Sequence, residues 1–69
     1  MYQVKNIDNP NWKNHRFTVI RDNRDESNSE MNGWWYFGSF DSLQLAQEKI
    51  RELGGKSWIV PTEDVEEVK

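Results

Sequence analysis

The fold of this 69-residue chain is decided by residues 34–60, which read WWYFGSFDSLQLAQEKIRELGGKSWIV. An aromatic run at 34–38 comes first and is typical of a central strand. A stretch with helical spacing follows at 41–53, and a short apolar run at 57–60 stops at Pro61. The stretch predicts strand, helix and strand, and a right-handed crossover places the two strands parallel to each other.

The helix at 41–53 is the most clearly marked element. Asp41 stands where it can cap the first turn, and Gln44 three residues later completes a capping-box pattern. Apolar residues recur at helical spacing and form one stripe: Leu43, Ala46, Ile50 and Leu53. Gly54 and Gly55 follow, and glycine readily adopts the backbone conformation that ends a helix. We expect this helix to cover one face of a sheet.

Two further strands are predicted upstream, at residues 2–7 and 16–21, separated by the turn-forming residues around Pro10. In the second of them, Phe17 and Val19 point to one face. The predicted fold class is α+β. Residues 1–69 form a single domain with a small mixed four-stranded sheet, in the sequence order β-β-β-α-β, and one helix packed on one face. The first three strands are expected to form an antiparallel meander.

Two segments contain little to bury. Residues 22–33 are almost entirely polar and end in Asn32-Gly33, so we expect a mobile polar loop leading into a strand. Residues 62–69 form an acidic tail. Thr62 at its start suits a short helical turn, and an extended edge strand is the alternative.

Composition narrows the classes of function. Hydrophobic residues make up 35% of the chain, and nine aromatic side chains must supply much of the core. No cysteine is present, and no apolar run approaches the roughly 20 residues of a membrane span, so we expect a cytoplasmic protein. The net charge of −3 arises within residues 34–69, and this acidity disfavours general binding to nucleic acid.

The sequence carries no recognisable catalytic, cofactor or metal motif, and we do not expect an enzyme. His15 is the one histidine; as a general base it lacks a suggested nucleophile and acid, so a surface histidine is favoured. Calcium binding is the alternative for four acids of the polar loop, but their spacing departs from that of an EF-hand: Asp22, Asp25, Glu26 and Glu30. No glycine-rich phosphate loop occurs.

The strand at 34–38 indicates where binding would take place. Trp34 and Tyr36 point to one face, and Trp35 and Phe37 to the other, while one helix covers a single face. The open face is covered by the segment around Trp12 with the valines of the tail, or by a partner. The candidate partner-binding residues are these aromatic residues and the acids of the tail: Trp12, Trp34, Trp35, Tyr36, Phe37, Glu63, Asp64, Glu66 and Glu67.

These observations favour a small non-catalytic protein-binding module, a stoichiometric regulator or inhibitor of phage or mobile-element type that occludes its partner's surface. The partner is another protein or a second copy in a homodimer. The acids of the tail are either a solvated terminus or a mimic of a phosphate backbone. The alternatives are a small housekeeping domain, or a weak single-stranded nucleic-acid binder that uses Trp12 with five basic residues of the N-terminal half: Lys5, Lys13, Arg16, Arg21 and Arg24.

One local pattern has a counterpart in a known family. Residues 38–42, Gly-Ser-Phe-Asp-Ser, lead into the helix and then into Trp58-Ile59-Val60-Pro61. This arrangement resembles half of a SPOR domain, a peptidoglycan-binding module, over about 28 residues from Trp34 to Pro61. The second helix–strand half of that family has no counterpart, since two strands stand upstream instead. We interpret the resemblance as a shared strand–helix turn rather than as kinship.

Overall fold

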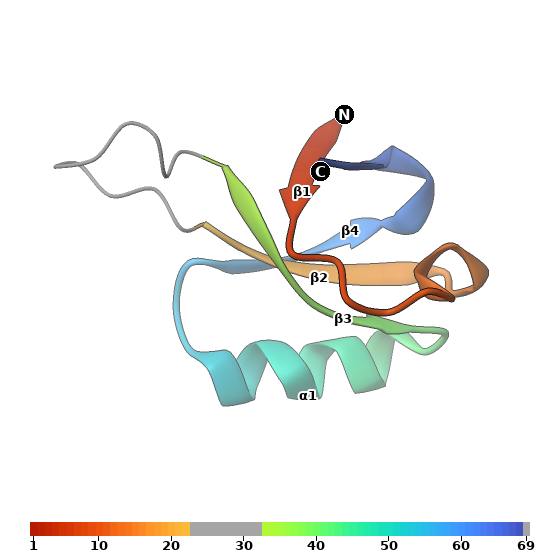
Figure 1. Cartoon of the computed structure of the whole chain (residues 1–69). Helices are drawn as coiled ribbons and strands as arrows, with labels where there is room; N and C mark the ends of the chain where they lie inside the picture. Colours follow the sequence, from red (N-terminus) through yellow and green to blue (C-terminus); the bar gives the residue numbers. More distant parts are fainter. Residues whose placement is uncertain (23–32, 69) are drawn as a thin grey trace, which may run out of the picture.

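The computed structural model describes residues 1–22 and 33–68. Within them the chain forms a five-stranded sheet in the order β4-β2-β3-β1-β5, with the helix α1 packed against it (Figure 1). Two short 3-10 turns, η1 and η3, complete the described elements. Their bounds are β1 Tyr2–Lys5, η1 Trp12–Asn14, β2 Phe17–Asp22, β3 Trp34–Phe40, α1 Leu43–Leu53, β4 Ser57–Pro61, η3 Thr62–Asp64 and β5 Val65–Glu67.

The small mixed α+β fold with one helix is confirmed, but the sheet has a strand more than expected. The fifth strand comes from the acidic segment, where β5 pairs in parallel with β1 through Tyr2–Val65 and Val4–Glu67. Both alternatives for this segment occur in turn, because the helical turn η3 directly precedes β5. A three-residue strand gives almost no periodic signal, so the sequence offered it only as an alternative and the predicted sheet did not count it. The predicted polar loop at 22–33 lies largely outside the described residues.

The expected meander of the first three strands is wrong for β1 but confirmed for the antiparallel pair of β2 and β3. β1 does not pair with β2; it runs parallel to β3 and to β5 on its two sides. β2 lies between β3 and β4 and is antiparallel to both, so β3 and β4 are parallel to each other, as the crossover rule requires. The connection at 6–16 is far longer than a tight hairpin needs, and this length lets the chain pass η1 before it enters β2.

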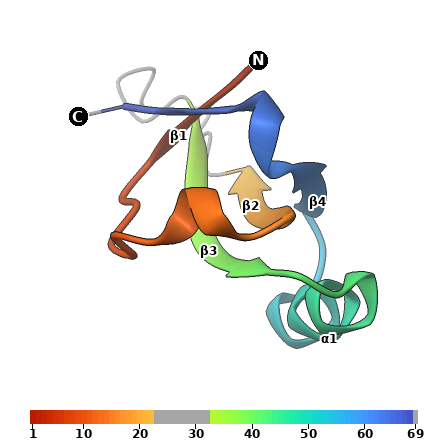
Figure 2. The ribbon, with the colours of Figure 1, turned by 90° about the vertical axis from the view of Figure 1, so that its right-hand side faces the viewer.

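The two faces of the sheet are covered by different parts of the chain. Val19 and Ala46 are fully buried on the side of α1, which contacts β2, β3 and β4. On the other face, Trp12 of η1 and Val65 of β5 join one core cluster with residues of the other four strands: Val4, Ile20, Tyr36 and Val60. Figure 2 shows α1 on one side of β2, β3 and β4, and β1 with the C-terminal segment on the other. This face was expected to be covered either by the chain itself or by a partner, and segments of the chain cover it.

The helix begins two residues later than expected, and its predicted cap is wrong. Ser42 is the N-cap, with an extended backbone and no side-chain hydrogen bond to the helix. The Asp41 carboxylate instead accepts hydrogen bonds from the segment before β2, so it is not available to the first turn. The predicted end is confirmed: Gly54 has a φ of 86°, and its N–H donates to the Ile50 carbonyl at 3.0 Å.

A bulge bends β3 at its centre. Val19 pairs with Gly38 while Ile20 pairs with Tyr36, so β3 has an extra residue there. Gly38 has a φ of +144°, and a Cβ at this position would lie 2.9 Å from the Phe40 ring. Only glycine fits this backbone without strain.

The start of η3 is anchored to the sheet by a buried hydrogen bond. The hydroxyl oxygens of Thr18 and Thr62 lie 2.9 Å apart, and both residues are buried. The Thr62 N–H also donates to the Arg16 carbonyl at 2.9 Å. These contacts hold the chain in place just before Val65 enters the core.

We predict that Gly38→Ala lowers the free energy of unfolding by about 1–3 kcal/mol, because the added methyl group meets the Phe40 ring in a strained backbone. Gly55→Ala is the control, since nothing lies within 4 Å of a Cβ added at Gly55. Urea unfolding of both variants measures the difference. Equal stability of the two variants would show that the bulge does not require glycine.

We predict that Thr18→Val and Thr62→Val each destabilise the fold by about 1–3 kcal/mol, because each leaves the other hydroxyl buried without its partner. The double variant is expected to lose less than the sum of the two single losses. Urea unfolding of the four proteins in this cycle gives the coupling. Strict additivity would contradict the role of this hydrogen bond.

Candidate functional site

A row of aromatic rings crosses the sheet on the face opposite α1. Trp34 packs edge-to-face against Tyr2 at a centroid distance of 5.7 Å and against Trp58 at 5.2 Å. The three side chains come from β1, β3 and β4. Trp58 is 45% exposed, the largest exposed aromatic side chain among the described residues. We call Tyr2, Trp34 and Trp58 the aromatic row.

The structure separates the aromatic residues that the sequence grouped together. Trp12 and Tyr36 lie in the core, with 5% and 9% of their surfaces exposed. Trp34 is half-buried in the aromatic row. Trp35 and Phe37 are partly buried, and Trp35 Nε1 is buried without a hydrogen-bond partner among the described residues. Of the aromatic candidates, Trp34 alone lies in the row with Trp58.

Trp58 is the residue that sequence reasoning missed. The run at 57–60 is short and apolar after Ser57, which is typical of a strand buried on both faces. β4 is instead an edge strand, and Trp58 lies at the position that pairs with Ile20 of β2. The one signal in the sequence was the change from polar Ser57 to apolar Trp58. An alternation this short does not identify Trp58 as an exposed side chain.

The four predicted acidic residues lie on folded elements. Glu63 and Asp64 belong to η3, and Glu66 and Glu67 to the edge strand β5. All four side chains are exposed. We call these four residues the acidic edge.

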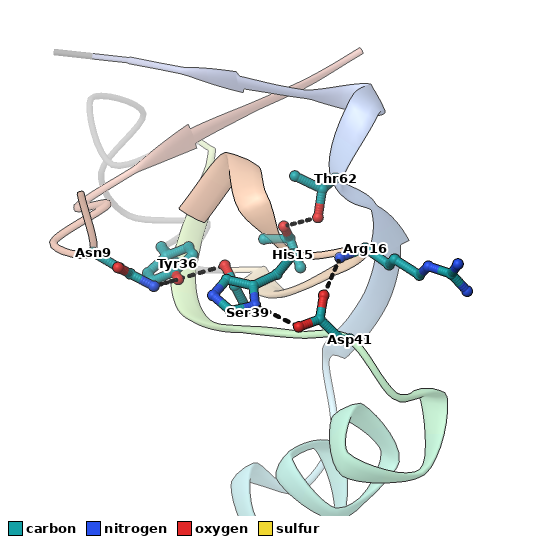
Figure 3. A network of polar contacts seen from close by, with 8 residues as sticks. Asn9, His15, Arg16, Tyr36, Ser39, Asp41 and Thr62 are labelled. Atoms are coloured by element: carbon teal, nitrogen blue, oxygen red, sulfur yellow. Dashed lines mark hydrogen bonds and ion pairs between the residues drawn. The ribbon is translucent and has the colours of Figure 1, made fainter. Parts of the chain in front are cut away.

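A second polar group joins the segment before β2 to the turn before α1 (Figure 3). His15 Nδ1 lies 3.0 Å from Asp41 Oδ2, and the Arg16 backbone N–H donates to Asp41 Oδ1 at 3.2 Å. These interactions hold the pKa of Asp41 below its usual value, mainly through the hydrogen bond with His15. The two partners are 26 residues apart, so local patterns gave no sign that His15 has an orienting acid.

The pair has one component of acid–base chemistry, an imidazole held by a carboxylate. Among the described residues, the hydrogen bonds of the His15 side chain go to Asp41 alone, so no nucleophile is joined to it. Its evident role is to tie two segments together. Close by, Tyr36 Oη lies 2.6 Å from Ser39 Oγ and accepts a bond from Asn9 Nδ2 at 3.4 Å, which fixes the β1–β2 connection against β3 (Figure 3).

The surface has a hollow of about 610 Å³ between η1 and η3. Its lining is Trp12, Lys13, His15, Arg16, Phe17, Pro61, Thr62, Glu63 and Val65. A second hollow, of about 540 Å³, lies along β3 beside Asp8 and Asn9. Over the described ranges 1–22 and 33–68, no three histidine or acidic side chains gather as metal ligands would. In the same ranges, no helix has the length and apolarity to cross a membrane.

Comparison with known proteins identifies no family for this chain. No protein-family model, curated protein or solved structure matches the chain.

We predict that Asp41→Asn flattens the acid dependence of stability. Because the pKa of Asp41 is lowered in the folded state, its contribution is present above the ordinary value of 3.8 and is lost as the pH falls through the lowered value. Asparagine still accepts a bond from the Arg16 N–H but has no charge to lose. Urea midpoints at about pH 6 and about pH 2.5 measure the change.

The control is Asp64→Asn, which removes an exposed acid on η3. This variant is expected to keep the acid dependence of the wild type more closely than Asp41→Asn does. An Asp41→Asn protein with an unchanged pH profile would mean that the contact with His15 does not persist in solution.

Proposed function

We propose that this chain is a small non-catalytic protein-binding module that works in the cytoplasm. The observation that carries the proposal is the aromatic row with its exposed end at Trp58. Tryptophan and tyrosine are enriched in the centres of protein interfaces, where a few such residues contribute most of the affinity. An edge-to-face row also holds its rings in place before binding, which limits the entropy lost on association.

The acidic edge supplies the second part of the proposed surface. Its four carboxylates are exposed on elements that Thr62 and Val65 anchor in the core. Fixed charges of one sign steer a partner of opposite charge and align it during encounter. We therefore propose a partner with a basic patch beside an apolar one. A stoichiometric regulator or inhibitor that occludes this patch, of the type found in phages and mobile elements, is the role that suits such a surface.

Binding to single-stranded nucleic acid receives less support. That function needs an aromatic platform next to basic side chains. Trp12 was the expected platform, but it is 5% exposed, and Lys13 Nζ lies 5.6 Å from the centroid of its ring. A base could not stack on Trp12 unless the core opened.

We predict that Trp58→Ala weakens partner binding at least tenfold and leaves the fold intact, because the side chain is nearly half exposed. Leu45→Ala is the matched control: Leu45 is an apolar residue of α1 that is 51% exposed and lies outside the aromatic row. The tagged chain and both variants are used to capture proteins from a host-cell lysate, followed by mass spectrometry. Circular dichroism checks the fold of each.

The expected result is one stoichiometric protein, captured by the wild type and by Leu45→Ala and lost with Trp58→Ala. If the partner is a second copy, sedimentation shows a dimer that Trp58→Ala converts to a monomer. Capture of RNA or DNA alone, with affinity falling steeply as salt rises, would contradict the proposal.

A further inference from the structure

The hollow between η1 and η3 lies apart from the aromatic row. Its residues gather where β2 begins and β4 ends, at the pairing of Phe17 with Pro61. Trp58 lies toward the other end of the same strand pair, where it meets Ile20. The hollow is therefore separate from the aromatic row, although Glu63 of the acidic edge is part of its lining. Its volume falls within the usual range for small-ligand sites.

The charges around the hollow differ in sign from those of the whole chain. Lys13 and Arg16 line it, and neither side chain has an acidic partner within 4.0 Å in the part of the chain that the structure describes. Glu63 is the one acid in the lining, and His15 is already paired with Asp41. The lining thus has an excess of positive charge, although the chain as a whole carries −3.

The remaining walls are mainly apolar. Trp12, Phe17, Pro61 and Val65 contribute them. A ligand that fills the hollow must therefore bury an apolar body and direct a negative group to the basic side. A single negative charge matches two permanent cations offset by one carboxylate better than a doubly charged phosphate does.

The basic side is held in place by the backbone. The Arg16 N–H donates to the Asp41 carboxylate, and its carbonyl accepts from the Thr62 N–H at 2.9 Å. Arg16 is thereby fixed between the turn before α1 and the start of η3, while its side chain is exposed (Figure 3). The Lys13 ammonium lies over the Trp12 ring at 5.6 Å from its centroid. The guanidinium of an exposed arginine can bind a carboxylate through two parallel hydrogen bonds.

We propose that this hollow binds a carboxylate carried on an apolar body. Arg16 pairs with the carboxylate, Lys13 adds a second positive charge, and the walls of Phe17 and Pro61 contact the apolar part. The carboxylate belongs either to a free small acid or to the C-terminal residue of a polypeptide, and both present the same chemistry.

The test uses NMR titration of the full chain with 3-phenylpropionate. We expect saturable shifts of the amides that line the hollow, with a Kd on the order of 1–10 mM for a ligand of this size. The neutral 3-phenylpropanamide tests the charge, and acetate tests the apolar body. Each is expected to bind at least about fivefold more weakly than the parent acid.

Arg16→Gln is expected to weaken 3-phenylpropionate binding about fivefold, because it removes the charged fork and keeps the backbone bonds. Arg51→Gln is the control, since Arg51 is an exposed arginine of α1 outside the lining. Equal binding of acid and amide, equal effects of the two variants, or no saturation at about 20 mM would overturn the proposal.

A further arm separates the two sources of the carboxylate. Tighter binding of the tripeptide alanyl-alanyl-phenylalanine than of 3-phenylpropionate assigns the hollow to polypeptide chain ends, and the reverse order assigns it to free acids. Both outcomes support a carboxylate site. This test does not involve Trp58. Carboxylate binding in the hollow can therefore be disproved while the proposed role of the aromatic row is kept, and the reverse also holds.

Discussion

The covering of the second sheet face by Trp12 and Val65 is the constraint on which the rest of the structure depends. A single helix of 11 residues can cover only one side of the sheet. The aromatic and aliphatic residues of the other side would face water if the chain did not return to it twice, once through η1 and once through β5. The buried bond between Thr18 and Thr62 sets the position of the second return. In the sheet order β4-β2-β3-β1-β5, β1 and β5 lie at one end, and Val65 of β5 joins the cluster from there.

Sequence patterns predicted the parts of the fold that are local. The end of the helix at Gly54, the two strands that flank the helix and their parallel orientation all depend on neighbouring residues or on the handedness of a crossover. Features that join distant residues were missed. The pairing of β1 with β3, the pairing of β5 with β1 and the contact between His15 and Asp41 each bring together residues far apart in sequence, and periodicity holds no information about such partners. Asp41 shows this most clearly. Its position predicted a cap for the helix, but its carboxylate bonds instead to His15 and to the Arg16 N–H.

The aromatic residues are divided between two tasks. Trp12 and Tyr36 stabilise the cluster, whereas Trp58 is exposed at the end of the aromatic row and Trp34 links the two groups. Because of this division, Trp58 at the outer end of the proposed interface can be substituted without loss of the fold. It also explains how a chain with 35% hydrophobic residues both folds and keeps a large ring on its surface. The hollow beside η1 adds a third use of the same residues, since the wall that Trp12 forms there is also a side of the core.

The pairing of β1 with β5 has a consequence for how the protein is made. Tyr2 and Val65 are neighbours in the sheet, so β1 pairs with a strand that is synthesised after all the other described strands. Until residue 65 emerges, the cluster around Tyr36 lacks one of its covering side chains, and β1 lacks one of its two neighbours. Topologies of this kind have a high contact order, because nearly the whole chain must close into a loop before the final contacts form. Folding is therefore expected to finish only after synthesis has passed β5, and a nascent chain stopped before that point would expose apolar surface to chaperones.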